Sequence, residues 1–130
     1  MKNWNMGLWV AQAVLAAVYA MAGFMKISQP IDALVASGMG YAGDYPEILT
    51  RFIGSAELLG AFGIILPALL RIMPVLTPLA ALGFSIIQVL AFALHFSRGE
   101  FGILPVNLVL LALSLFVLWG RSRKAPIAPR

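Results

Sequence analysis

Long apolar runs, separated by short polar or proline-containing links, dominate the pattern of this chain. Four such runs cover about residues 4–25, 52–70, 73–96 and 103–119. A membrane-spanning helix needs roughly 20 apolar residues, within a range of about 17 to 25, and all four runs fall near that length. They lack the alternation of apolar and polar residues that is typical of membrane β-strands. The pattern therefore predicts an all-α membrane protein with four transmembrane helices in a single domain, residues 1–130.

The links between the runs predict how the helices are arranged. After the first run, Ser28 can cap a helix, Pro30 suits its first turn and Gly38 can end it, which indicates a short helix at the membrane interface. Asp44 and Glu47 then have the spacing of a capping box, which would start the second long helix before the membrane proper. The other two links are short, and short links make neighbouring helices antiparallel. We therefore expect a four-helix up-down bundle with one short interfacial helix between the first two spans.

Lysine and arginine are distributed unequally between the two sides of such a bundle. One side holds both termini and the link around residue 71, and the other side holds the remaining two links. The first side has six basic residues and the second has three: Lys2, Arg71, Arg121, Arg123, Lys124 and Arg130 against Lys26, Arg51 and Arg98. Because positively charged segments stay in the cytoplasm, we expect both termini to be cytoplasmic, in a bacterial inner (plasma) membrane.

A cleaved signal peptide is the alternative interpretation of the first run. Lys2, the apolar stretch and the small residues Ala20 and Ala22 resemble a secretory signal with its cleavage site. Against cleavage, the run is long enough to span a membrane, and no polar segment precedes Ala22. We therefore expect residues 1–22 to be retained in the mature protein.

The composition agrees with a membrane location and excludes several kinds of chemistry. Hydrophobic residues make up 62% of the chain and charged residues 11%, which is less than half of the roughly 25% charge typical of soluble domains. The sequence has no cysteine, which excludes disulfides, thiolate metal sites and cysteine redox chemistry, and we expect no metal site. The net charge of +4 is small and concentrated near the C-terminus, so we expect no nucleic-acid partner. Among the few charges, Arg98 and Glu100 lie in a link and are expected to be solvated.

Five polar residues are the candidates for a ligand-binding site. Glu57 lies inside the second apolar run, whereas Lys26, His95 and Asn107 lie at ends of the other three runs. The predicted topology brings these four residues to the outer half of the bundle, with Gln88 two helical turns deeper than His95. A bare carboxylate facing lipid would cost roughly 2.5 to 3.5 kcal/mol. We therefore expect Glu57 to face the bundle interior, within ion-pairing reach of Lys26 or His95.

The spacing of polar residues along each run supports this arrangement. Gln12, Tyr19 and Lys26 are seven residues apart, and so are Gln88 and His95. Residues seven apart share one helix face. A face that carries polar groups should turn away from lipid.

Each candidate also has a purely structural interpretation. Glu57 and Lys26 can form a fixed ion pair between helices that binds no ligand. Gln88 and Asn107 can be interhelical hydrogen-bonding residues, and His95 can be a hydrogen-bonded residue at a helix end. The sequence leaves both interpretations open.

Four runs of this chain can be compared with known families: "GFMK" at 23–26, "RFIGSAELLGAFGIILP" at 51–67, "LTPLAALGFSIIQVLAFALHFSRGE" at 76–100 and "NLVLLALSLFVLWGR" at 107–121. Together these runs resemble the DoxX-like family of small four-helix membrane proteins. The resemblance covers almost the whole chain and implies the same membrane fold. The family is named after a subunit associated with thiosulfate:quinone oxidoreduction, and related small membrane proteins are linked to the assembly of other membrane proteins or to redox stress.

Two hypotheses for the function follow, from different classes. In the first, a polar pocket in the outer half of the bundle binds a small apolar ligand, quinone- or lipid-like. Lys26 and His95 would donate hydrogen bonds to a carbonyl, and Glu57 would relay a proton. In the second, the polar cluster only fixes the bundle, and the lipid-facing surface docks another membrane protein or a second copy of the chain.

A membrane subunit of a quinone-linked oxidoreductase is a variant of the first hypothesis, with a quinone as the cofactor. The chain has one histidine, no cysteine and no nucleotide-binding loop, which argues against an autonomous redox enzyme. Electron transfer would need a bound organic cofactor or a partner subunit. The sequence does not decide whether the protein is an enzyme.

Reporter fusions test the predicted topology. A fusion after Gly43 should report export, and a fusion after Arg130 should report the cytoplasm, because the basic residues favour that orientation. A cytoplasmic signal at residue 43, or an exported one at residue 130, would contradict the prediction.

Overall fold

The structure is a computed structural model that describes residues 2–130, with the backbone alone for Lys2. Met1 and the Lys2 side chain, which the basic-residue count and the signal-peptide alternative include, lie outside the described residues. In chain order the elements are α1 (Lys2–Ser28), α2 (Ile31–Ala36), α3 (Tyr41–Asp44), α4 (Glu47–Leu70), α5 (Leu76–Ser97), the 3-10 turn η1 (Phe101–Ile103), α6 (Leu104–Trp119) and the π-helical turn η2 (Gly120–Lys124). Among residues 2–130, four helical stretches are long and apolar enough to cross a membrane: Asn3–Ser28, Glu47–Leu70, Leu76–Ser97 and Phe101–Lys124. These stretches confirm the predicted all-α fold with four spans.

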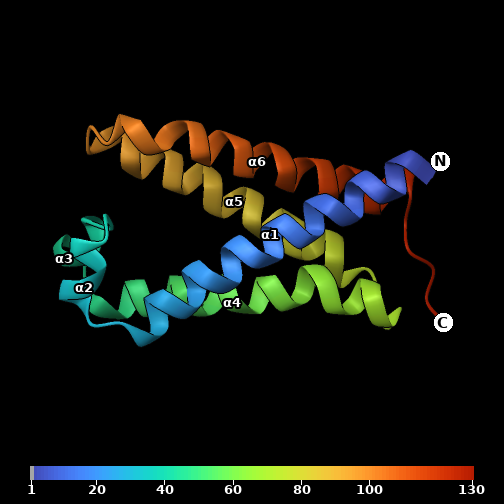
Figure 1. Cartoon of the computed structure of the whole chain (residues 1–130), viewed down its shortest axis with the longest axis horizontal. Coiled ribbons are helices and arrows are strands. Elements are labelled where there is room, and N and C mark those ends of the chain that lie inside the picture. The colour runs from blue at the N-terminus through green and yellow to red at the C-terminus, as the bar shows by residue number, and fades with distance from the viewer. Residues whose placement is uncertain (1) are drawn as a thin grey trace.

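The four long helices form two closely packed pairs, α1 with α4 and α5 with α6 (Figure 1). Both termini lie at one end of the molecule, which we call the terminal end; the opposite end, with α2, α3 and the link at 98–103, is the loop end. At the terminal end α1 meets α6, where Trp4 packs edge-on against Trp119 with ring centroids 5.3 Å apart. Toward the loop end the two pairs diverge, and α2 and α3 lie beside the gap (Figure 1).

The link between α1 and α4 contains two short helices instead of the one predicted. Gly38, with φ at +110°, follows α2 and confirms the predicted helix stop. The predicted cap at Ser28 is wrong, because Ser28 is the last residue of α1 and its hydroxyl donates to the Phe24 carbonyl oxygen at 2.6 Å. Pro30 occupies the cap position of α2 instead of its first turn. Proline suits this position because its φ is already restricted and it has no N–H to leave unbonded.

Helix α4 starts at Glu47, ahead of its apolar run, as predicted, but the capping box is wrong. Asp44 ends α3, and Pro46 stands at the cap position of α4 without a side-chain cap. The Asp44 carboxylate instead pairs with Nη1 of Arg98 at 2.7 Å. A tertiary ion pair has therefore replaced the local contact that the spacing suggested.

The turn between α4 and α5 is tight, as predicted, and involves two left-handed residues. Arg71 has φ at 58° and Met73 has φ at 47°, so α5 begins only at Leu76. The C-terminal tail packs against this turn, since Nε of Arg71 donates to the Ala128 carbonyl oxygen at 2.9 Å. The turn and the tail thus close the terminal end together.

The buried apolar core lies midway along the bundle. Tyr19 of α1 stacks flat on Phe84 of α5, with ring centroids 3.7 Å apart. A Cβ atom at Gly60 of α4 would lie 2.5 Å from Cε1 of Phe84, so only glycine leaves room for this ring. The other core residues surround this stack: Ala11, Leu15, Ala61, Ile64, Ala81 and Val117.

Helices α1 and α4 touch through their backbones near the loop end. A Cβ atom at Gly23 would lie 2.7 Å from both the Gly54 carbonyl oxygen and the Leu58 nitrogen, and one at Gly54 would lie 3.0 Å from the Gly23 carbonyl oxygen. Small residues permit such approach in membranes, where van der Waals packing drives helix association. This contact brings the side chains that follow Gly23 in α1 up to α4.

Replacing Gly23 with alanine should therefore force the two helices apart. We expect a loss of about 1 to 3 kcal/mol in unfolding free energy, because the new methyl group meets backbone atoms that cannot rotate away. Unfolding of the purified protein in detergent measures the loss. Gly83→Ala in α5 is the matched control, since its Cβ meets no atom within 4 Å and alanine favours a helix. Equal stability of the two variants would contradict the backbone contact.

Candidate functional site

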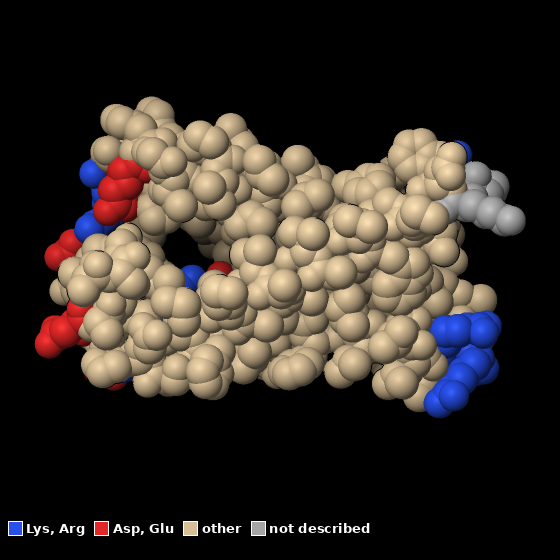
Figure 2. Space-filling view, viewed as in Figure 1, with Lys and Arg blue, Asp and Glu red and all other residues tan. Residues whose placement is uncertain are grey.

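A cavity of about 550 Å³ lies at the loop end between the two helix pairs. Its lining is mainly apolar and comes from all four long helices and from the α2–α3 segment. Figure 2 shows the hollow, with basic and acidic atoms inside it; Lys26 and Glu57 are the basic and acidic residues that line it. The volume falls within the range of roughly 300 to 1,000 Å³ that is usual for small-molecule sites.

The first polar group of this cavity is an ion pair between α1 and α4. Nζ of Lys26 lies 2.7 Å from Oε1 of Glu57, and the Glu57 side chain is only 5% exposed. The prediction that Glu57 faces the interior within reach of Lys26 is therefore confirmed. Arg51 holds the end of α1 in place, because its Nη1 donates to the carbonyl oxygens of Lys26 at 2.9 Å and Gln29 at 2.6 Å.

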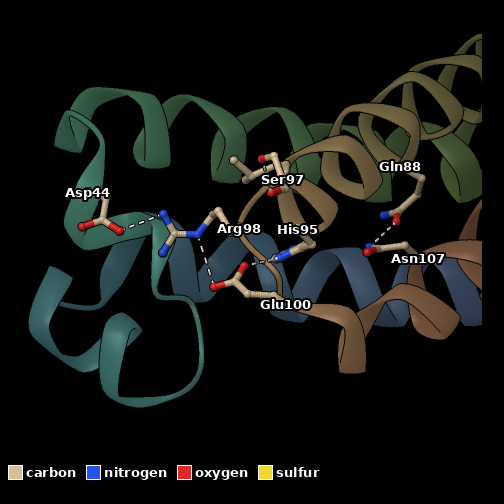
Figure 3. Close-up of polar contacts among 8 residues, drawn as sticks. Asp44, Gln88, His95, Ser97, Arg98, Glu100 and Asn107 are labelled. Atoms are coloured by element: carbon tan, nitrogen blue, oxygen red, sulfur yellow. Dashed lines mark hydrogen bonds and ion pairs between the residues drawn. The ribbon is translucent and has the colours of Figure 1, made fainter.

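The second polar group is a hydrogen-bonded chain that joins three helices. Nε2 of Gln88, in α5, donates to the Tyr19 hydroxyl of α1 at 2.5 Å. Nδ2 of Asn107, in α6, donates to Oε1 of Gln88 at 2.9 Å (Figure 3). All three side chains are buried and line the cavity. We call this arrangement the amide chain.

The third group is a charged network at the loop end, drawn in Figure 3. Nδ1 of His95 contacts Oε1 of Glu100 at 2.7 Å, and Arg98 contacts Glu100 at 3.2 Å and Asp44 at 2.7 Å. Arg98 and Glu100, which were expected to be solvated, keep side chains that are 23% and 33% exposed and form these ion pairs as well. Gly99, with φ at +73°, turns the chain back so that Glu100 reaches His95.

This network favours the charged forms of Glu100 and Arg98 and ties α3 to the link between α5 and α6. The hydrogen bond from His95, with further hydrogen bonds and attraction from Arg98, lowers the pKa of Glu100 below its usual value. Hydrogen bonds to Asp44 and Glu100 raise the pKa of Arg98 in turn. Opposite charges are thus paired at the loop end of the bundle.

The structure brings all five candidate residues to one cavity but does not join them into one cluster. Lys26 pairs with Glu57, and Gln88 pairs with Asn107. His95 pairs with Glu100, which lies in the link between two spans. Within residues 2–130, no group of three or more potential ligand side chains is arranged to hold a metal ion. A ligand-binding role for the five residues stays a prediction.

Tyr19 and Tyr41 also line the cavity, and the sequence interpretation did not include them as candidates. Tyr19 shares a helix face with Lys26 at a spacing of seven, and that spacing is the signal that could have identified it. Tyr41 lies in α3 and packs edge-on against His95, with ring centroids 6.2 Å apart. Its position depends on the fold of the link, for which the sequence carries no comparable signal.

A second buried polar cluster lies at the terminal end, away from the cavity. Arg121, expected in the basic tail, is only 4% exposed. Its Nε donates to Oε1 of Gln12 at 2.7 Å and its Nη1 to Oδ1 of Asn5 at 2.8 Å, while its guanidinium lies 5.3 Å from the ring centroid of Trp9. This cluster ties η2 to α1, so Arg121 acts in the packing of the helices.

Comparison with known proteins places the chain in a family. The sequence model of the DoxX-like family matches residues 10–117, which include all five candidate residues and most of the chain. The chain belongs to the DoxX-like family. No curated protein and no solved structure matches it. Together with the four apolar helices, the family match identifies this DoxX-like protein as a small integral membrane protein.

A double-mutant cycle tests the coupling between Lys26 and Glu57. Glu57→Gln or Lys26→Met alone should cost about 3 to 5 kcal/mol of unfolding free energy, because each leaves the partner's charge buried and unpaired. The double variant should cost clearly less than the sum of the two.

The exposed pair of Glu47 and Arg51 supplies the control for this cycle. Its oxygen and nitrogen lie 3.0 Å apart, but the Glu47 side chain is 63% exposed. Glu47→Gln should therefore cost less than about 1 kcal/mol. Additive losses in the Lys26 and Glu57 variants would show that the two charges do not depend on each other.

Proposed function

We propose that this DoxX-like protein binds an uncharged, mainly apolar molecule, quinone- or lipid-like, in the cavity at the loop end. The observation that carries the proposal is that an ion pair and an amide chain border a cavity of about 550 Å³. Polar groups that only join helices need no space beside them, since membrane helices associate by close packing. The combination of apolar walls with a few polar groups is the usual composition of a small-molecule site.

The charges around the cavity favour an uncharged ligand. Lys26 is already neutralised by Glu57 at 2.7 Å. Among the described residues, no other lysine, arginine, aspartate or glutamate lines the cavity. A charged head group would enter an apolar surrounding without a counter-ion of its own, and such burial is costly. A carbonyl or hydroxyl head would instead use the hydrogen-bonding groups that the cavity offers.

The position of the hollow favours entry from the lipid phase. It opens on a side of the bundle, between the diverging helix pairs (Figure 2). Apolar, partly exposed side chains of α1 and α6, such as Val18 and Val106, line it there. The contacts of Arg98 with Asp44 and Glu100 lie at the loop end of the bundle and are not part of the cavity lining. We infer that a membrane-dissolved molecule reaches the cavity without crossing water.

We propose that the loop end lies on the outer side of a bacterial plasma membrane, with both termini in the cytoplasm, and the unequal distribution of basic residues supports this orientation. A membrane subunit of a quinone-linked oxidoreductase is the alternative function. In it the bound molecule is a quinone, and a partner subunit supplies the electrons because this chain has no cysteine and one histidine. In the second hypothesis, another membrane protein or a second copy of the chain docks on the lipid-facing surface. That function does not need a molecule bound in the cavity.

Mass spectrometry of co-purifying molecules tests the proposal. The wild-type protein, extracted in mild detergent, should retain an apolar molecule in a fixed ratio. Ala91→Phe should reduce the retained amount at least about tenfold, because Ala91 lines the cavity and its replacement fills space. Ala93→Phe is the matched control: it lies on the same helix, is exposed, and should retain the molecule.

Identical retention by the two phenylalanine variants would contradict binding in this cavity. Recovery of bulk membrane lipid alone, in equal amounts from all three proteins, would contradict it as well. Recovery of a quinone that only Ala91→Phe loses would support the oxidoreductase alternative.

A further inference from the structure

We propose that the terminal end of this protein binds the headgroup of an anionic phospholipid, at a site formed by Arg71 and Arg130. Arg71 lies in the turn between α4 and α5, and Arg130 lies in the C-terminal tail. Both side chains are exposed. The cavity lies at the opposite end of the bundle, so the inference does not depend on the proposed function.

Charge is distributed unequally between the two ends of the molecule. All five acidic residues of the chain lie toward the loop end: Asp32, Asp44, Glu47, Glu57 and Glu100. Each of the three basic residues in that half contacts a carboxylate at 3.0 Å or less. The exposed basic residues of the terminal end contact no acidic side chain within residues 2–130: Arg71, Arg123, Lys124 and Arg130.

Figure 2 shows the result on one face of the molecule. Acidic and basic atoms are mixed at the loop end, whereas basic atoms without acidic neighbours gather at the terminal end. The terminal end thus presents positive charge that no aspartate or glutamate of the described chain balances.

The fold brings two of these cations together from distant parts of the chain. Nε of Arg71 donates to the Ala128 carbonyl oxygen at 2.9 Å, and the backbone N–H of Arg130 donates to the Arg71 carbonyl oxygen at 3.0 Å. These bonds hold the tail against the turn and leave the rest of both guanidinium groups without a partner among residues 2–130. Like charges held close together repel each other, and an anion bound by both would offset that repulsion.

Exposed apolar residues around the turn indicate that the anion belongs to a lipid. Leu69, Leu70, Ile72 and Met73 flank Arg71 in the chain and are exposed. One span ends at Leu70 and the next begins at Leu76, so the turn lies where hydrocarbon meets headgroups. A phospholipid offers a phosphate to the arginines and acyl chains to the apolar side chains, whereas a free phosphate ion offers only the former.

The two tryptophans of the terminal end mark the same depth. Trp4 and Trp119 are exposed, and tryptophan favours the headgroup level of a bilayer. Nζ of Lys124 lies 5.8 Å from the centroid of the Trp4 ring, which holds a further cation at that level. The terminal end is therefore basic at the depth where lipid phosphates lie.

The headgroup should carry a net negative charge. Guanidinium groups bind phosphate oxygens through paired N–H donors, and every phospholipid has such a phosphate. The choline of phosphatidylcholine would bring another cation to a site that already has two. The glycerol of phosphatidylglycerol is neutral and leaves the phosphate charge unopposed. We therefore expect the site to prefer phosphatidylglycerol.

Native mass spectrometry of the full chain measures this preference. Dioleoylphosphatidylglycerol and dioleoylphosphatidylcholine, which have the same acyl chains, are titrated separately into the protein in detergent. The wild type should bind the first phosphatidylglycerol about tenfold more tightly than the first phosphatidylcholine, because each basic residue near the headgroups adds attraction for anionic lipid.

Variants of the two arginines test the site itself. Arg71→Gln combined with Arg130→Gln should remove most of the tenfold preference. Arg71→Lys keeps the charge but not the Nε contact, and should retain the preference within about twofold, which separates charge from packing of the turn. Arg98→Gln is the control for net charge, since it removes a cation that Asp44 and Glu100 already neutralise at the loop end. It should keep the preference of the wild type.

Equal binding of the two lipids to the wild type would overturn the inference, as would a preference that the double glutamine variant keeps in full. An equal loss in Arg98→Gln would overturn it too, because net charge alone would then explain the preference. If the double variant does not fold, Arg130→Gln alone decides, since its backbone contact with Arg71 is unchanged; it should lose about threefold.

Inorganic phosphate tests whether the site takes a free anion instead. It should not raise the thermal unfolding midpoint of the wild type in detergent, since it offers nothing to the apolar residues around the turn. A rise that Arg130→Gln abolishes would assign the site to a free phosphate ion and overturn the lipid assignment.

Discussion

Glu57 cannot face lipid without a large cost, and the ion pair that it makes with Lys26 governs the loop end of this protein. A bare carboxylate at the centre of a bilayer costs roughly 2.5 to 3.5 kcal/mol. The two charges lie 2.7 Å apart only because the backbones of α1 and α4 touch. Gly23 and Gly54 permit that contact, since a Cβ atom at either position would meet atoms of the opposite helix. Two glycines therefore determine where the only acidic residue inside a predicted span finds its partner.

The cavity follows from a difference between the two ends of the bundle. At the terminal end, α1 and α6 pack closely through Trp4 and Trp119, and buried Arg121 bonds back to Gln12. At the loop end the helix pairs diverge, and the amide chain is the polar connection from α1 through α5 to α6. Because the helices pack closely at the terminal end and diverge at the loop end, the cavity forms at the loop end, next to the polar side chains of the amide chain.

The sequence was sufficient to place the five candidate residues around one cavity, because polar residues at equal depth must turn away from lipid toward a common interior. It was not sufficient to assign their partners. His95 meets Glu100 because Gly99 adopts φ of +73°, and a conformation of this kind cannot be read from spacing. Arg121 entered the prediction only as one of the basic residues on the cytoplasmic side, yet it is buried, because it bonds to residues of α1 at the other end of the chain.

The sequence by itself determined the properties that each helix has independently of the others. These are the four spans, their lengths and the inward direction of their polar residues. These depend on local hydropathy and on the bilayer, which every segment meets separately. The tertiary structure decided how close the helices come, and with that the cavity and the ion pair. The distance between two helices depends on residues that are far apart in the sequence, such as Gly60 and the Phe84 ring that packs against it. A local sequence pattern cannot predict such a contact.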